Sequence, residues 1–467
     1  MIQILPHEKI DILSKYKDLI NQTEVIKFTG RVERVVGLTI ESKGPVVKHG
    51  ELCKIEIDNG EFLFAEVVGF NKDRIVLMPI GEMKGVIAGA EVTAAGASLS
   101  VPVGPELLGR VINGLGKPLD SKGEIFTKET YPVMGKSMNP LVRSIIEKPL
   151  SVGIRAIDGL NTVGKGQRIG IFSGSGVGKS ILLGMIARYT SADINVIVLI
   201  GERGREVRNF VEKELGEEGL KRSVVVVATS DQPPMLRIRG AFLGHAVAEY
   251  FRDKGKDVNL MMDSVTRFAL AQREVGLAAG EPSATRGFPP SVFSLLPRLL
   301  ERSGTKEGSG SITGFYTILV EADDMNEPIA DAVRGILDGH LVLDRNLANK
   351  GHYPAIDVLA SISRCMRDVT EKDHQKAAGQ FRELLASYRE AEDLINLGAY
   401  AKGSNPLVDK AIEMIGKINA FLKQDMYEKD TYDNILSKLK GMFTQEPVKP
   451  PRKDLINQRR PFPAAKR

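Results

Sequence analysis

The order of hydrophobic and polar positions divides the chain into segments with different periods. From residue 24 to residue 95, short runs rich in Val, Ile and Phe are separated by turn residues, and Asn59-Gly60 lies between two of these runs. Runs of this kind are typical of antiparallel strands, and Asn-Gly is a favoured hairpin turn. The segment is therefore predicted to form a small β-barrel.

Residues 150–370 have the pattern of an α/β domain. Continuous apolar runs of strand length, such as residues 196–200 and 224–227, alternate with stretches of helical periodicity. Strands that are apolar throughout are buried on both faces, which predicts a parallel sheet with helices on either side. Residues 96–149 are rich in Gly and Pro and are predicted to connect the barrel to this core.

The two ends of the chain differ from the middle. Residues 371–443 have helical periodicity, with Asn405-Pro406 placed as N-cap and first-turn proline of one helix. Residues 1–23 are predicted to form an amphipathic arm, which either packs on the rest of the chain or docks on another protein. Residues 444–467 are basic and Pro-rich, and we expect them to be disordered.

Composition narrows the class of protein. Apolar residues make up 42% and charged residues 26% of the chain, so a packed core is expected. No apolar run approaches the roughly 18 residues of a membrane span, and the first 20 residues lack the apolar stretch of a secretion signal. With only Cys53 and Cys365, a disulfide framework is not expected and a reducing cytoplasm fits.

The net charge of +5 is concentrated at one end. From residue 447 onward there are seven Lys or Arg and one Asp, a local charge of +6, so residues 1–446 sum to −1. The body thus lacks the net positive charge that is typical of nucleic-acid-binding proteins, and no nucleic-acid partner is expected. The six histidines show no helical pair at metal-ligand spacing, so no zinc site is expected.

The strongest chemical signal is a glycine loop between a strand and a helix. The sequence SGSGVGKS occupies residues 173–180, after QRIGIF and before ILLGMIARYT. Glycines let successive backbone N–H groups turn toward the phosphates of a nucleotide, a lysine adds charge, and a hydroxyl can bind Mg²⁺. The strict pattern has Gly where Ser173 stands. The predicted nucleotide-binding residues are Gly174, Ser175, Gly176, Val177, Gly178, Lys179 and Ser180.

Two acids follow other apolar strands. Asp263 ends the run DVNLMM and is predicted to hold Mg²⁺ with Ser180, because a carboxylate at that strand end lies beside the phosphate loop. Glu202 follows the run INVIVLIG and is predicted to polarise the attacking water as general base. ATP and Mg²⁺ are therefore the expected ligands.

The body of the chain, from about residue 24 to 443, resembles the rotary ATPase α/β subunit superfamily. The motifs responsible are GRVINGLGKPLD (109–120), GERGREV (201–207), MMDSVTRF (261–268) and the segment from Tyr353 to Arg364. Within it the chain is most similar to the flagellar type III protein export ATPases, especially through LINLGAYAKGSNPLVDKAI (394–412). The resemblance implies a RecA-like P-loop core, an N-terminal small β-barrel and a C-terminal helical domain.

The same resemblance implies how the site works. It predicts a homohexameric ring in which Arg364 reaches the nucleotide of the neighbouring subunit, Tyr353 flanks the adenine, and Arg203 and Arg267 support the site. It also implies a stator-like regulatory protein on the N-terminal arm and a stalk-like protein in the ring pore. An export gate at the membrane, export substrates and their chaperones are further expected partners, and the expected location is the cytoplasmic face of the cell membrane.

Other functions remain open at this stage. A virulence-type secretion ATPase shares most of these motifs. A catalytic ATP synthase subunit would carry an acidic loop against a rotor, whereas residues 276–290 contain a single acid, Glu281. Glu202 argues against a nucleotide-binding but inactive ring subunit. An RNA translocase would need stacking aromatics in a basic groove, and the predicted barrel contains no Trp or Tyr.

Overall fold

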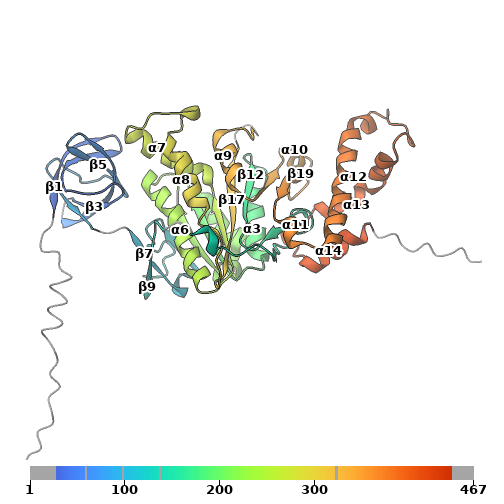
Figure 1. Ribbon diagram of the computed structural model, residues 1–467, viewed down its shortest axis with the longest axis horizontal. Helices are drawn as coiled ribbons and strands as arrows, with labels where there is room; N and C mark the ends of the chain where they lie inside the picture. Colours follow the sequence, from blue (N-terminus) through green and yellow to red (C-terminus); the bar gives the residue numbers. More distant parts are fainter. Residues whose placement is uncertain (1–27, 58–59, 97–98, 136–137, 321–323, 444–467) are drawn as a thin grey trace, which may run out of the picture.

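The computed structural model describes residues 28–443, apart from residues 58–59, 97–98, 136–137 and 321–323. The β-barrel, the central sheet and the last three helices follow one another along the long axis of the molecule (Figure 1). This arrangement confirms the predicted fold class. The predictions for the arm, residues 1–23, and for the tail, residues 444–467, lie outside the described residues.

The barrel has six strands that close on themselves in the order β1-β2-β5-β4-β3-β6. Its interior is filled by alternate apolar residues, among them Val32, Ile55 and Leu77. The predicted Asn59 turn falls partly outside the described residues, but the strands on either side of it pair antiparallel, as a hairpin requires. The strands are β1 Thr29–Val36, β2 Thr39–Lys43, β3 Leu52–Glu56, β4 Phe62–Asn71, β5 Arg74–Pro79 and β6 Glu91–Ala94.

The central sheet has nine strands, in the order β19-β18-β12-β17-β15-β13-β14-β8, with β16 beside β17. The pairs from β18 to β8 are parallel, as predicted, whereas β19 and β16 run antiparallel to their neighbours. The strands are β12 Arg168–Ser173, β13 Ile194–Ile200, β14 Ser223–Ala228, β15 Val258–Asp263, β16 Gly304–Thr305, β17 Ser311–Leu319, β18 Gly339–Leu343 and β19 Ile356–Ser363.

The segment expected to be a connector contributes to this sheet. Strand β8, Arg110–Asn113, pairs in parallel with β14 and forms the edge opposite β19. Only Ile112 of its four residues is buried, so it lacks the apolar run that marks the other strands. Two further strands of the segment, β7 Ser100–Val103 and β9 Glu129–Pro132, pair with each other.

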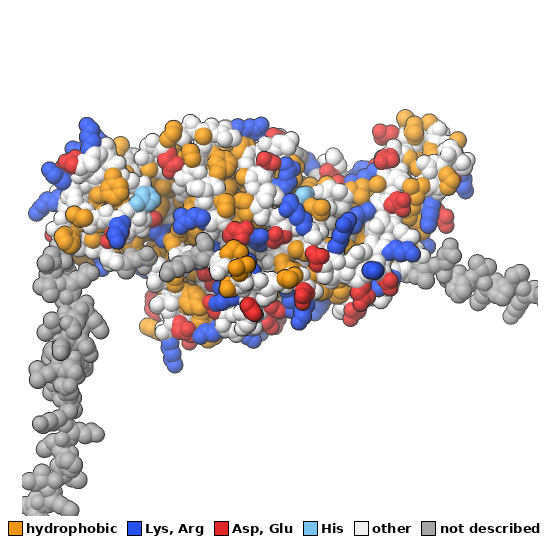
Figure 2. Space-filling model, viewed as in Figure 1, with side chains coloured by type: hydrophobic (Ala, Val, Ile, Leu, Met, Phe, Trp, Pro, Cys, Tyr) orange, Lys and Arg blue, Asp and Glu red, His pale blue; other side chains and the backbone are white. Residues whose placement is uncertain are grey.

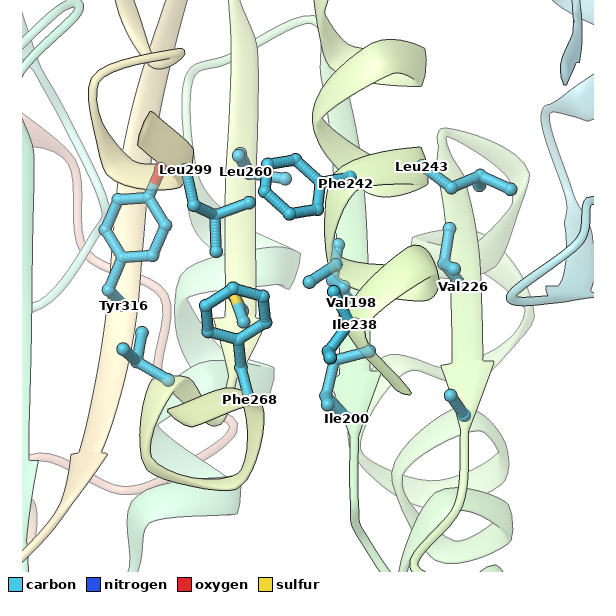
Figure 3. Close-up of a cluster of buried hydrophobic side chains, with 14 of the residues drawn as sticks. Val198, Ile200, Val226, Ile238, Phe242, Leu243, Leu260, Phe268, Leu299 and Tyr316 are labelled. Carbon is cyan, nitrogen blue, oxygen red and sulfur yellow. The ribbon is translucent and has the colours of Figure 1, made fainter. Parts of the chain in front are cut away.

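Helices cover both faces of the sheet. Val198 and Ile200 of β13 pack toward α6 and α7, while Ile197 and Leu199 belong to the apolar cluster on the α3 side. Figure 3 shows the first cluster, where the Phe242 ring lies among the strand residues between sheet and helices. The helices on that face are α6 Pro234–Asp253, α7 Val265–Ala278, α8 Pro290–Leu300 and α9 Pro328–Ile336, and α3 Lys179–Tyr189 lies on the other.

The C-terminal helices are α12 Lys372–Asn396, α13 Pro406–Leu422 and α14 Tyr432–Gly441. Asn405 caps α13 through its side chain and Pro406 opens the helix, as predicted. Helices α12 and α13 form a hairpin that projects from the end of the molecule (Figure 1). The remaining short elements are β10 Pro149–Leu150, β11 Val163–Gly164, α2 Arg155–Asp158, α4 Gly204–Asn209, α5 Gly216–Lys221, α10 Arg345–Asn349 and α11 Met366–Val369.

Figure 2 shows acidic, basic and apolar side chains interspersed over the visible face. In the described part of the chain, every helix is too short or too polar to cross a lipid bilayer.

Candidate nucleotide site

The glycine loop joins β12 to α3 at the carboxyl edge of the parallel strands. Gly176 has φ 79° and Gly178 has φ 95°, a left-handed conformation that favours glycine. Ser173 is instead the last residue of β12, paired with Leu319 and Leu343 on either side, so its position does not require glycine. Within the loop, Gly174 and Val177 are buried, whereas Ser175 is exposed.

Lys179 and Ser180 are the first two residues of α3. The free N–H groups and the positive end of the helix dipole at this point attract anions such as phosphate. The loop and helix therefore provide the local structure that the sequence predicts for a nucleotide site.

The structure brings Lys179 and the two predicted acids together. The Nζ of Lys179 lies 2.5 Å from Oδ1 of Asp263, which ends β15. It lies 3.7 Å from Oε1 of Glu202, which is two residues beyond β13. β15 and β13 are neighbouring parallel strands, so their carboxyl ends meet at one edge of the sheet. Thr317 also donates a hydrogen bond of 2.7 Å to Oδ1 of Asp263. This contact of Thr317 was not predicted, because the residue lies inside an apolar strand.

The environment of Glu202 favours its neutral form. Burial, the negative charge of Asp263 and the neighbouring Glu206 together raise the pKa of Glu202 to about 7, against the opposing effect of Lys179. A carboxyl group with a pKa near neutrality can exchange a proton with a substrate water at physiological pH. Glu202 therefore has the proton affinity expected of a general base.

The oxygen groups at the site fit a magnesium ion. The hydrogen bonds that Lys179 and Thr317 donate to Asp263 both go to Oδ1. The hydroxyl of Ser180 is exposed and likewise makes no hydrogen bond with described residues. No group of three His, Cys, Asp or Glu side chains in the described chain could hold a metal alone. This donor set suits Mg²⁺, which keeps several waters and shares substrate phosphates.

Tyr353 lies beside the glycine loop. It lines a cavity of about 240 Å³ with Val177 and Gly178 of the loop and with Met426. A side chain at Gly178 would come within 3.5 Å of the Tyr353 ring, which shows how closely the two segments approach. The walls are largely apolar, as expected where a flat base is stacked rather than hydrogen-bonded. Residues 424–426, in the loop between α13 and α14, form one wall. They were not predicted, because this loop belongs to the C-terminal helical region and carries no motif.

The predicted arginines occupy different positions. Arg267, on α7, packs against Gly201, and its Nε is buried without a hydrogen-bond partner among the described residues. It therefore lies next to the strand end that carries Glu202. Arg203 is 77% exposed and forms an ion pair of 3.2 Å with Glu206. Its support of the site remains a prediction.

Arg364 lies at the amino ends of the parallel strands, whereas the glycine loop lies at their carboxyl ends. It follows β19, whose last residue Ser363 pairs with Gly339 at the start of β18, and its N–H donates to the carbonyl of Asp338. Asp338 in turn pairs with Arg168, the first residue of β12. Arg168 lies five residues before Ser173, the last residue of β12. At about 3.3 Å per residue, the two ends of the strand are roughly 17 Å apart. The guanidinium of Arg364 is therefore remote from the phosphate loop of its own chain.

Three family models together match most of the described chain, apart chiefly from residues 97–152. The nucleotide-binding domain of the ATP synthase alpha/beta family matches residues 153–363, and the β-barrel domain of that family matches residues 32–96. The C-terminal domain of the type III secretion ATPase EscN matches residues 370–441. The three matches follow the same order as the barrel, the central sheet and the C-terminal helices.

Curated relatives are similar over almost their full length. The chain is 55% identical to the flagellum-specific ATP synthase of Bacillus subtilis, over 92% of this chain and 98% of that protein. It is 54% identical to the type 3 secretion system ATPase of Xanthomonas euvesicatoria, over 88% of this chain and 93% of the other. The flagellum-specific ATP synthase of Salmonella typhimurium is 50% identical, over 89% and 93%.

A solved structure shows the same fold. The assembled ATPase EscN from the type III secretion system of enteropathogenic E. coli superposes with a TM-score of 0.84 and 45% identity, covering 88% of this chain and 99% of EscN. EscN in complex with its central stalk EscO superposes with a TM-score of 0.82. The chain therefore belongs to the ATP synthase alpha/beta family, as an ATPase of its flagellar and type III secretion branch.

Proposed function

We propose that this ATPase energises flagellar type III protein export as a homohexameric ring, by unfolding export substrates or releasing them from chaperones and delivering them. The flagellar assignment rests on residues 394–412, which resemble flagellar more than virulence-type ATPases. Relatives of both kinds are about equally similar, at 55% and 54% identity, so the virulence role is the alternative. An ATP synthase role is disfavoured because the loop of residues 276–290 contains one acid.

In the proposed reaction, the phosphates of ATP are bound by the loop of residues 174–178 and by the ammonium of Lys179. Ser180 and Asp263 would hold Mg²⁺, which supplies charge neutralisation for the phosphates. Glu202 orients the attacking water and accepts its proton. Its raised pKa and its place beside the lysine support this role.

The observation that carries the ring proposal is the position of Arg364. A positive charge beside the γ-phosphate is worth about 10³ to 10⁵ in rate. Arg364 is about one strand length away from its own phosphate loop, is exposed, and makes no side-chain hydrogen bond or ion pair with described residues. Such an arginine can serve a nucleotide only in another subunit. The solved structure of assembled EscN supports an assembly of this kind.

The remaining partners follow from the same assignment. We propose that the N-terminal arm binds a stator-like regulatory protein and that a stalk-like protein occupies the pore. The complex of EscN with its central stalk EscO supports the second partner. The ring would work in the cytoplasm at the inner face of the cell membrane, against an export gate.

Two measurements test this function. ATPase activity per subunit should rise steeply with protein concentration as rings form, whereas constant specific activity from monomer to oligomer would contradict a shared site. Producing the chain in a bacterium that lacks its flagellar export ATPase should restore swimming. Restored effector secretion in a strain that lacks its virulence secretion ATPase, without restored swimming in the first strain, would favour the alternative.

A further inference from the structure

The loop between α13 and α14 belongs to the C-terminal helices, yet it forms a wall of the nucleotide cavity. Gln424 and Met426 of this loop face the same space as Tyr353 and Gly178. We propose that Gln424 is a positioning residue that sets the position of Tyr353 against this loop, and so the affinity for the base portion of the nucleotide. The inference rests on the proposed role of Tyr353 beside the adenine.

Gln424 joins three separate segments of the chain. Its backbone N–H donates to the carbonyl of Tyr353 at 2.9 Å, while its side-chain Nε2 donates to the carbonyl of Gly153 at 2.8 Å. Its Oε1 accepts from the N–H of Arg155 at 2.9 Å. Nε2 also donates to the carbonyl of Glu428 at 2.8 Å, within the loop. The side chain thus ties the loop to the core, and the backbone ties Tyr353 to the loop.

This arrangement leaves Gln424 unsuited to contact a ligand directly. Only 4% of the residue is exposed, and both N–H groups and the carbonyl oxygen of its side chain already have partners. A buried side chain with all its groups satisfied has one rotamer available, so the position it enforces is well defined. Gln424 therefore acts through Tyr353.

A second anchor holds the same loop from the other side. The guanidinium of Arg155 donates to the carbonyl of Phe421 at 2.8 Å and to the carbonyl of Lys423, and it pairs with Glu428. With this support, the loop would stay near the core when Gln424 is changed. The specific consequence of the change would then be a less fixed backbone at residue 424. Tyr353 would become less fixed with it, because its carbonyl accepts from the N–H of that residue.

The change at Gln424 should weaken binding of the base of the nucleotide and leave binding of its phosphates unaffected. The apolar walls of a cavity of about 240 Å³ lose packing contacts when one wall shifts by a fraction of an ångström. The phosphate loop is held independently by β12 and α3. A change at Gln424 should therefore weaken ligands that carry a base and leave base-free phosphates unaffected.

The test compares Gln424→Ala with Gln375→Ala in the full chain. Gln375, on α12, donates from Nε2 to the carbonyls of Arg367 and Thr370, so its variant also loses two bonds to backbone carbonyls, away from the cavity. Three constants are measured: the KM for ATP, kcat, and the inhibition constant of inorganic tripolyphosphate. Gln424→Ala should raise the KM for ATP about 10-fold, with kcat and the tripolyphosphate constant within about 2-fold of the parent. Gln375→Ala should change none of the three.

Equal changes in the KM for ATP and in the tripolyphosphate inhibition constant, or an unchanged KM, would overturn the inference. Tyr353→Ala separates this failure from failure of the proposed site. If Tyr353→Ala raises the KM while Gln424→Ala does not, only the positioning role is wrong. If neither raises it, the assignment of Tyr353 falls as well.

A measurement on the unaltered chain avoids any folding defect of the variants. Hydrogen exchange at the amide of Gln424, which donates to Tyr353, should slow when ATP binds and stay the same with tripolyphosphate. Equal protection by both ligands would contradict the inference.

Discussion

The ammonium of Lys179 lies 2.5 Å from a carboxylate oxygen of Asp263, although 84 residues separate them in the sequence. Glu202 lies 3.7 Å from the same ammonium. The lysine therefore lies beside both acids, one of which the proposed reaction assigns to the metal and the other to the water.

The different roles of Lys179 and Glu202 predict different defects. Lys179→Ala should abolish detectable nucleotide binding, because the proposed site places the ammonium on the phosphates in the ground state. Glu202→Gln should bind nucleotide normally and lose about 10²- to 10⁴-fold in kcat, because the amide cannot accept a proton. Binding of a fluorescent ATP analogue and steady-state hydrolysis should be measured on both variants. Equal loss of binding in the two would show that Glu202 acts on the nucleotide and not on water.

The raised pKa of Glu202 predicts a pH profile. The general base must be ionised, so kcat/KM should fall as the pH drops below about 7, well above the ordinary value of 4.5 for a glutamate. Glu206 contributes to the raised pKa, so Glu206→Gln should move this acid limb to lower pH. Profiles from about pH 5.5 to 9 would measure the shift.

Glu212→Gln is the matched control, because Glu212 is an exposed acid of the following turn paired with Arg208. It should leave the acid limb in place. If Glu206→Gln leaves the acid limb of the kcat/KM profile in place, a group other than Glu202 is responsible for that limb.

The anchor at Arg155 predicts a loss of stability. Arg155→Ala leaves Asp430, whose side chain is 3% exposed, with Lys438 as its remaining cationic partner. Loss of one member of a buried charge cluster costs about 3 to 5 kcal/mol, so the C-terminal helices should unfold earlier than the core. Arg208→Ala removes an ion pair whose arginine is 77% exposed and should cost less than about 1 kcal/mol. Denaturant unfolding would compare the two, and equal losses would contradict the assigned role of Arg155.

The core of the site could be predicted because it consists of short-range patterns. Lys179 follows a glycine loop, Asp263 ends an apolar run, and Glu202 follows another by two residues. The carboxyl ends of parallel strands lie at one edge of the sheet. A parallel sheet therefore brings these three side chains to the same edge. The structure agrees with each of these placements.

Other features leave no local pattern. The antiparallel direction of β19 was not visible, because an apolar run reads the same in either direction. Strand β8 was missed because Ile112 alone is buried. Gln424 contributes to the cavity through a loop about 245 residues beyond the phosphate loop, and a single polar residue in a loop gives no periodic signal. Contacts of this kind depend on tertiary packing.

Subunit mixing tests the shared site most directly. Arg364→Ala alone should bind ATP nearly normally and hydrolyse it at least about 10³-fold more slowly, and Lys179→Ala alone should be inactive. Mixed rings of the two variants contain some interfaces with an intact lysine on one side and an intact arginine on the other. Mixtures that exchange subunits should therefore recover part of the activity, with a maximum at intermediate ratios. Mixed rings that stay inactive at every ratio would show that Arg364 does not act on the neighbouring nucleotide, and the account would be wrong at its centre.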